Sequence, residues 1–174
     1  MKVPLESVKE LRNLTSASIA DCRKILEETS GDIKKAMELI RKRGLEMAAK
    51  KQDRLTKEGR IEAYVHLGNK VGVLLEVGCE TDFVAKNPDF TQFTRDLAMQ
   101  IVACNPQYIK SEDVPEQDLE HEKTKEEFFK AHCLMSQVYV KDPSITVRDY
   151  LGSIVAKMGE NIVVRKFTRY KVGE

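Results

Sequence analysis

Two adjacent side chains, the carboxylate of Asp82 and the phenyl ring of Phe83, directly follow a stretch that has apolar residues at alternate positions, Val71–Cys79. The alternation predicts a strand. Thr81 or Asp82 can cap a short helix after it by accepting a hydrogen bond from a free backbone N–H. A carboxylate and a ring at such a corner are well placed to contact another molecule. The pattern alone favours a simpler interpretation, in which Asp82 only caps and Phe83 only fills the core, because aromatic side chains are more often buried.

Other residue patterns that carry out chemistry are missing from the sequence. It contains no Gly-x-Gly-x-x-Gly motif, no Walker-type phosphate loop and no Gly-x-Ser-x-Gly turn. His66 and His121 are isolated, and His132 with Cys133 supplies at most two metal ligands, whereas a closed zinc site needs four. We therefore expect no enzymatic activity, no metal and no cofactor.

Length and charge restrict the class of protein. The 174 residues suffice for one ordinary domain and a small module. The 29 basic and 28 acidic residues give a net charge of +1, which argues against a general nucleic-acid or membrane binder. No apolar run reaches the roughly 20 residues that span a bilayer. A protein partner or a small ligand is the expected target.

The cysteines indicate the cellular compartment. Cys22, Cys79, Cys104 and Cys133 are widely spaced and form no Cys-x-x-Cys motif. Cys22 and Cys104 fall on apolar helix stripes and Cys79 on the buried strand face, as small core residues do in a reducing compartment. We expect a cytoplasmic protein.

The elements that must position the corner begin with an N-terminal helical module. Residues 1–44 predict three short helices, with a break at residues 30–32 and an end at Gly44, where a left-handed residue is expected. Three such helices bury little surface, so the module either binds a partner or folds as a cap onto the main domain. Residues 45–59 are charged and poor in apolar positions, which predicts a solvated linker helix.

The remaining chain, residues 60–174, predicts an α+β core. Its elements, in chain order, are strands over residues 61–67 and 71–79 with a hairpin turn at 68–70, a helix over 88–104, an acidic helical stretch over 116–129, a loop over 141–144, a helix over 146–158 and a strand over 161–172. This β-β-α-α-α-β order predicts an antiparallel sheet that is covered by helices. With the module and linker helix, the fold class is α+β.

Two further hypotheses remain open from the residues alone. A small helical bundle is compatible with a non-enzymatic adaptor that recognises a peptide, and the basic strand from Arg165 to Lys171 is compatible with an RNA-binding adaptor. The near-neutral total charge weighs against RNA.

Several stretches together resemble the bacterial elongation factor Ts family. The run from Val71 through Cys79-Glu80-Thr81-Asp82-Phe83-Val84-Ala85-Lys86-Asn87 looks like the family signature, and Gly159-Glu160-Asn161-Ile162-Val163-Val164-Arg165-Lys166-Phe167 looks like its C-terminal module. Residues 21–24 and 31–36 resemble its ubiquitin-associated-like three-helix module. The chain departs from the family pattern at residues 15–20, which lack two glycines and a methionine, and in a shorter region between residues 116 and 134.

The resemblance implies a guanine-nucleotide exchange factor for elongation factor Tu that binds its partner in GDP-bound and nucleotide-free forms. By motif, the contact residues would be Thr81, Asp82, Phe83 and Val84, with Phe83 acting as a wedge, and the helical module would add Arg12 and Ile19. The short form of the family further implies a homodimer, formed by the strand face around Phe167. Neither a membrane nor direct nucleic-acid binding is implied.

Overall fold

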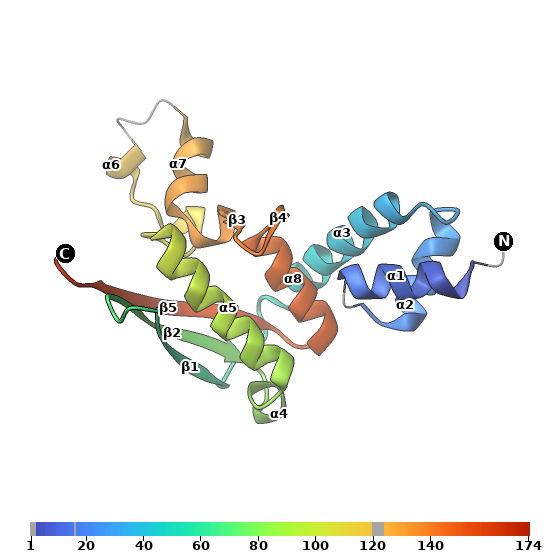
Figure 1. The fold of residues 1–174 in the computed structure, drawn as a ribbon, viewed down its shortest axis with the longest axis horizontal. Helices are drawn as coiled ribbons and strands as arrows, with labels where there is room; N and C mark the ends of the chain where they lie inside the picture. The colour runs from blue at the N-terminus through green and yellow to red at the C-terminus, as the bar shows by residue number, and fades with distance from the viewer. Residues whose placement is uncertain (1–2, 16, 120–123) are drawn as a thin grey trace.

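The computed structural model describes residues 3–15, 17–119 and 124–174. Three N-terminal helices lie at one end of an elongated molecule, and a three-stranded antiparallel sheet with helices along one face lies at the other (Figure 1). The predicted α+β class is confirmed.

The helical module consists of α1 (Leu5–Thr15), α2 (Ile19–Glu28) and the first part of α3 (Ile33–Lys51). Side chains start two of these helices, since Ser18 accepts a hydrogen bond from the backbone N–H of Asp21 and Asp32 accepts one from Lys35. The module has a hydrophobic cluster of its own, formed by Val8, Leu11, Cys22, Ile25, Leu26 and Ala36.

The third helix does not end at Gly44, and there is no separate linker helix over residues 45–59. Helix α3 continues through Gly44 to Lys51, and the chain then loops to strand β1 (Glu58–Val65). Gly44 serves close helix packing, because a Cβ atom there would lie 3.1 Å from the carbonyl oxygen of Gly152 in α8 (Val147–Met158). The prediction that Gly44 ends the helix is therefore wrong: this glycine lies inside α3, where it allows α3 and α8 to cross closely.

The sheet has the strand order β1-β2-β5, with β2 (Val71–Cys79) at its centre and β5 (Ile162–Lys171) at one edge. Both neighbouring pairs are antiparallel. The β1–β2 turn contains Gly68 and Asn69, which both have positive φ angles of 89° and 56°. This hairpin agrees with the sequence prediction, except that β1 begins and ends earlier than expected.

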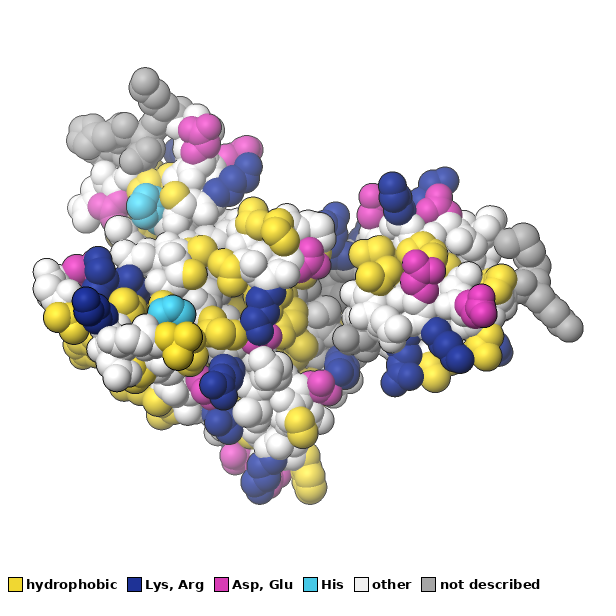
Figure 2. Space-filling view, viewed as in Figure 1, with side chains coloured by type: hydrophobic (Ala, Val, Ile, Leu, Met, Phe, Trp, Pro, Cys, Tyr) yellow, Lys and Arg dark blue, Asp and Glu magenta, His cyan; other side chains and the backbone are white. Residues whose placement is uncertain are grey.

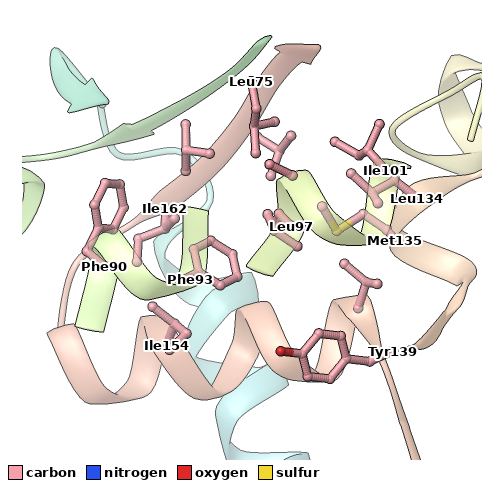
Figure 3. Packing of buried hydrophobic residues seen from close by; sticks show 14 of the residues in the cluster. Leu75, Phe90, Phe93, Leu97, Ile101, Leu134, Met135, Tyr139, Ile154 and Ile162 are labelled. Carbon is pink, nitrogen blue, oxygen red and sulfur yellow. The ribbon is translucent and has the colours of Figure 1, made fainter. Parts of the chain in front are cut away.

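One face of the sheet is covered by α5 (Pro88–Cys104), which begins at the predicted cap Asn87 and ends at Asn105, with φ of 45°. Helix α8 has Thr146 as its N-cap and Gly159 as its C-cap, also as predicted. The side chains from β2, α5, α8 and the intervening segment meet in one core (Figure 3). The fully buried members include Leu75, Val77, Phe90, Phe93, Leu97, Ile101 and Leu134.

The segment between α5 and α8 differs from the prediction. It contains the 3₁₀ helix η1 (Ser111–Asp113), α6 (Glu116–Leu119), α7 (Lys125–His132), the 3₁₀ helix η2 (Leu134–Ser136) and the hairpin of β3 (Val138–Tyr139) and β4 (Asp142–Thr146). The expected acidic helix over residues 116–129 is therefore represented by two short helices, and His121 lies outside the described residues.

The loop predicted over residues 141–144 instead belongs to the β3–β4 hairpin. The buried side chain of Gln100 holds this hairpin, since its Nε2 donates to the carbonyl of Val138 and its Oε1 accepts from the N–H of Val140. Buried Asp96 accepts hydrogen bonds from Tyr139 and Tyr150. These contacts connect residues 38 to 54 positions apart, so local turn signals could not predict them.

Candidate functional site

The chain turns sharply where β2 ends. Thr81 is the N-cap of α4 (Asp82–Ala85), with extended φ and ψ of −127° and 158°. Val84, in the middle of this one-turn helix, is buried at 8% exposure and packs against the core. Helix α4 is therefore held by the packing of Val84 in the core and by the cap Thr81 at its N-terminus, while Asp82 and Phe83 face outward.

Phe83 does not fill the core. Its exposed fraction is 82%, whereas Phe90 and Phe93 in the next helix are fully buried. The interpretation that the pattern alone favoured, a ring that fills the core at this corner, is wrong. Hydrophobic and charged side chains lie side by side over α4 at the surface (Figure 2). An exposed phenyl ring loses contact with water only when another molecule covers it.

Asp82 lies next to this ring and forms an ion pair within its own helix. Its carboxylate accepts a hydrogen bond from Lys86 Nζ at 2.7 Å, and this bond lowers the pKa of Asp82 below its ordinary value. The carboxylate is thus ionised at neutral pH. Because the pair lies at the surface, solvent screens it and a partner group can replace Lys86 at little cost.

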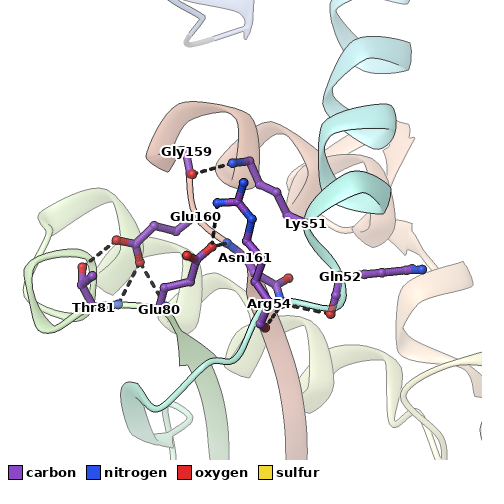
Figure 4. A network of polar contacts seen from close by, with 8 residues as sticks. All are labelled: Lys51, Gln52, Arg54, Glu80, Thr81, Gly159, Glu160 and Asn161. Atoms are coloured by element: carbon purple, nitrogen blue, oxygen red, sulfur yellow. Dashed lines mark hydrogen bonds and ion pairs between the residues drawn. The ribbon is translucent and has the colours of Figure 1, made fainter.

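A second layer of contacts fixes the corner from behind (Figure 4). Glu160 Oε2 accepts hydrogen bonds from the backbone N–H groups of Glu80 and Thr81, both at 3.0 Å, and Glu160 Oε1 accepts one from the Thr81 hydroxyl at 2.6 Å. Sequence reasoning missed Glu160 as a functional candidate, because about 80 positions separate it from the corner and no local motif signals the contact.

The other two predicted contact residues lie elsewhere. Arg12 is exposed on α1, and Ile19 is 52% exposed at the start of α2, near Leu14 at 54%. Figure 1 shows α1 and α2 beside the N-terminal part of α3, at the end of the molecule away from the sheet and well separated from α4. The predicted residues therefore lie in two places. The helical module carries Arg12 and Ile19, and the corner carries Thr81, Asp82, Phe83 and Val84, of which Val84 is buried in the core.

The sheet itself offers a third exposed surface. On the side away from α5, which we call the open sheet face, β1, β2 and β5 contribute Ile61, Ala63, Val65, Leu74, Thr168 and Tyr170. Leu74 is 50% exposed and Tyr170 is 70% exposed. Phe167 does not lie on this face: it pairs with Leu75, shares the covered side of the sheet and packs, partly buried, against the core. A dimer contact around Phe167 therefore stays a prediction.

The basic residues of β5 are already paired with carboxylates. Arg165 and Lys166 lie 3.5 and 3.3 Å from the carboxylate of Glu76, and Arg169 and Lys171 lie 3.0 and 2.6 Å from that of Glu174. A phosphate backbone would have to displace these partners. The four basic residues share these two carboxylates, so part of their positive charge is neutralised within the chain, which weakens the case for RNA binding.

Two further results concern the described residues alone. Among them, no three His, Cys, Asp or Glu side chains come together in a way that could hold a metal ion. The helices that they form include none that combines the length and the apolar character needed to cross a membrane.

Comparison with known proteins assigns the family. Residues 4–127 match the family model described as elongation factor TS. The chain is similar to elongation factor Ts of Carboxydothermus hydrogenoformans, with 45% identity over 97% of this chain and 88% of the relative. The corresponding protein of Caldanaerobacter subterraneus subsp. tengcongensis is 44% identical over 99% and 98% of the two chains, and that of Thermotoga neapolitana is 45% identical over 100% and 99%.

The last two alignments extend over 195 positions, more than the 174 residues of this chain, so the chain carries deletions relative to these relatives. Identity over nearly the whole length nevertheless includes the helical module, the corner and the C-terminal strand. The chain belongs to the elongation factor Ts family of translation elongation factors.

Proposed function

We propose that this protein is a guanine-nucleotide exchange factor for elongation factor Tu, which promotes release of GDP by disturbing the magnesium and phosphate site of its partner. The observation that carries the proposal is the exposed ring of Phe83, 82% accessible on a helix that is itself anchored by buried Val84. Family membership supplies the identity of the partner.

The geometry suits a wedge. An anchored aromatic side chain enters a partner without losing much conformational freedom, and one such residue commonly contributes on the order of 2 kcal/mol or more to binding. Asp82, ionised and held only by Lys86 at the surface, can exchange that cation for hydrogen-bond donors of the partner. The protein forms and breaks no covalent bond in this mechanism, because contact energy alone shifts the nucleotide equilibrium.

The coupling must be reciprocal. A factor that weakens GDP binding is itself bound more weakly by the GDP complex, and to the same degree. The protein would therefore bind the nucleotide-free partner more tightly than the GDP-bound partner. Arg12 and Ile19 on the separate helical module would supply affinity for both forms without contributing to this difference.

Release of fluorescent GDP from elongation factor Tu tests the proposal. Phe83→Ala should lower the maximal release rate about 30-fold, the equivalent of ~2 kcal/mol. Asp82→Ala should lower it less, because Asp82 is a surface carboxylate whose interactions are screened by solvent. Leu67→Ala is the matched control, since Leu67 is 91% exposed but lies in the β1–β2 turn. Unchanged release with both corner variants, at unchanged circular dichroism, would disprove the assignment of this site.

Variants of the helical module should give a different kinetic result. Arg12→Ala and Ile19→Ala should raise the concentration of factor needed for half-maximal release and leave the maximal rate near that of the wild type. A fall in the maximal rate alone would show that the module does more than bind.

We also propose a homodimer, which the open sheet face would form with its counterpart in a second copy. The support is the apolar character of Ile61, Val65, Leu74 and Tyr170, each at least 50% exposed. In sedimentation velocity, Leu74→Glu should convert a dimer to a monomer, because two carboxylates would be buried against apolar side chains. Leu5→Glu, which places the same charge on a 57% exposed leucine of α1, should leave the dimer intact. A monomeric wild type at micromolar concentration would refute the homodimer.

The adaptor hypotheses have less support. The ion pairs along β5 neutralise part of the charge that favoured RNA. Helix α3 runs without interruption from the helical module to its contact with α8, so residues 1–44 do not end at an element boundary. If the protein were an RNA-binding adaptor, its affinity for RNA would fall steeply with salt concentration, which titration of the intact chain with RNA would detect.

A further inference from the structure

Two carboxylates on different elements form a reciprocal arrangement behind the exposed corner. Glu160, just after α8, accepts three hydrogen bonds from Glu80 and Thr81, while Glu80 accepts one in return from the backbone N–H of Asn161 at 2.6 Å. We call these residues, Glu80, Thr81, Glu160 and Asn161, the clasp. Each chain segment thus supplies a carboxylate to the backbone of the other (Figure 4).

The clasp also reaches the end of the long helix. The side-chain amide of Asn161, which is only 4% exposed, donates to the carbonyl oxygens of Gln52 at 3.1 Å and Arg54 at 2.8 Å. Lys51 Nζ donates to the carbonyl of Gly159 at 2.7 Å. Residues 159–161 therefore connect three segments: the end of β2, the end of α3 and the loop that follows α3.

The hydrogen bonds are of a kind that fixes orientation. Bonds to an ionised carboxylate are about twice as strong as bonds between neutral groups, and both oxygens of Glu160 are used. Thr81 cannot reorient without breaking two of these bonds. The capping bond that its hydroxyl accepts from the N–H of Val84 in α4 is longer, at 3.5 Å. The cap of α4 is thus held mainly from outside the helix.

We propose that Glu160 is a positioning residue for the corner, and that through the clasp it fixes the direction of Phe83 relative to α3 and hence to the helical module. Glu160 acts through Thr81 and contacts no partner itself. This inference rests on the proposed function for its activity readout. It adds a determinant of the corner's orientation that lies about 80 residues away in the sequence and accepts three hydrogen bonds from the corner.

A purely structural brace would make a different prediction. If Glu160 only stabilised the fold, its loss would lower activity in proportion to unfolding and would add to the loss caused by removing the Phe83 ring. If it positions the ring, its loss has little left to affect once the ring is gone, because effects on one functional unit are not additive.

The first experiment is independent of nucleotide exchange. Amide hydrogen exchange, followed by NMR in the intact protein, should show slow exchange at the N–H groups of Glu80 and Thr81. Glu160→Ala, which removes both acceptor oxygens, should raise both rates about tenfold or more. The control Asp89→Ala removes a different carboxylate, which forms an ion pair with Lys157 Nζ at 2.8 Å, and should leave both rates unchanged. Unchanged rates in Glu160→Ala would overturn the clasp.

The second experiment measures release of fluorescent GDP from elongation factor Tu with Glu160→Ala, Phe83→Ala and the double variant. We expect Glu160→Ala to lower the maximal rate about tenfold in the wild-type background and less than about twofold in the Phe83→Ala background. Glu160→Asp should not rescue the rate, since its shorter side chain cannot reach both N–H groups and the hydroxyl. Equal losses in both backgrounds would overturn the positioning role.

The two proposals fail in distinguishable ways. If the wild-type protein does not accelerate release at all, the proposed function fails, while the amide exchange rates still test the clasp. If the wild type accelerates release and Phe83→Ala abolishes most of it, but Glu160→Ala and Asp89→Ala both behave as wild type, the positioning role alone is wrong.

Discussion

Adjacent leucines of strand β2 show how differently the two faces of the sheet are used. Leu75 is fully buried beneath α5, whereas Leu74, one position earlier, is 50% exposed on the open sheet face. The same contrast separates Phe90, which is fully buried, from Phe83, which is 82% exposed. Residue type therefore does not decide burial here; the placement of α5 and α8 does. The covered side stabilises the chain, and the exposed apolar residues are available to other molecules.

Substitutions of Leu75 and Leu74 test this contrast between the two faces of the sheet most directly. Leu75→Ala should lower the free energy of unfolding by about 2–5 kcal/mol, because it removes buried methyl groups and leaves a cavity in the core. Leu74→Ala should lower it by less than about 0.5 kcal/mol in the monomer. Urea unfolding, at a protein concentration at which sedimentation shows monomers, measures both. Similar losses in the two variants would show that the open sheet face also contributes to the core.

A second covered contact joins the helical module to the core. Gly44→Val should cost about 1–3 kcal/mol, because the side chain would meet the backbone of Gly152, which cannot move aside as a flexible side chain can. Valine has a slightly better helix propensity than glycine, so propensity cannot cause this loss. Lys42→Val, at an exposed position of the same helix, measures the effect of a valine that faces solvent. Urea unfolding should therefore separate the two variants; equal costs would mean that α3 and α8 tolerate a wider separation.

Local signals in the sequence were sufficient for the elements on which the corner stands. The period of β2, the cap at Asn87 and the glycine after α8 each involve neighbours within a few residues, and the structure confirms them. Gly44 was misjudged because a helix-ending glycine and a helix-crossing glycine look alike in sequence, and only the distant Gly152 distinguishes them.

The candidate site was predictable only in part, because its geometry also depends on residues that are distant in the sequence. Asp82 and Phe83 could be identified as residues able to contact a partner, but periodicity could not decide whether the ring faces the core, because α4 is a single turn and has no repeating pattern. Glu160 could not be linked to the corner by any local motif. The hairpin of β3 and β4 likewise depends on Gln100, about 40 residues away.

The covered face also predicts how stability depends on alkaline pH. Cys79, fully buried at the end of β2, has its pKa raised from 9.0 to about 11, first by burial and then by the charges of Glu160 and Glu58. A raised pKa means that the folded state keeps its proton longer than the unfolded state. The resulting stability is complete below the ordinary pKa of 9.0 and is lost as the pH rises towards 11.

The free energy of unfolding should fall by about 1 kcal/mol between about pH 8 and about pH 10 because the Cys79 thiol ionises more easily in the unfolded chain. In urea unfolding, the gap in free energy between wild type and Cys79→Ala should therefore shrink by that amount over this range. Val77→Ala removes a buried, non-titrating neighbour on the same face, so its gap to wild type should stay constant. A constant gap for Cys79→Ala as well would mean that the thiol ionises as easily in the folded chain as in the unfolded one, and that this end of the covered face is open to water.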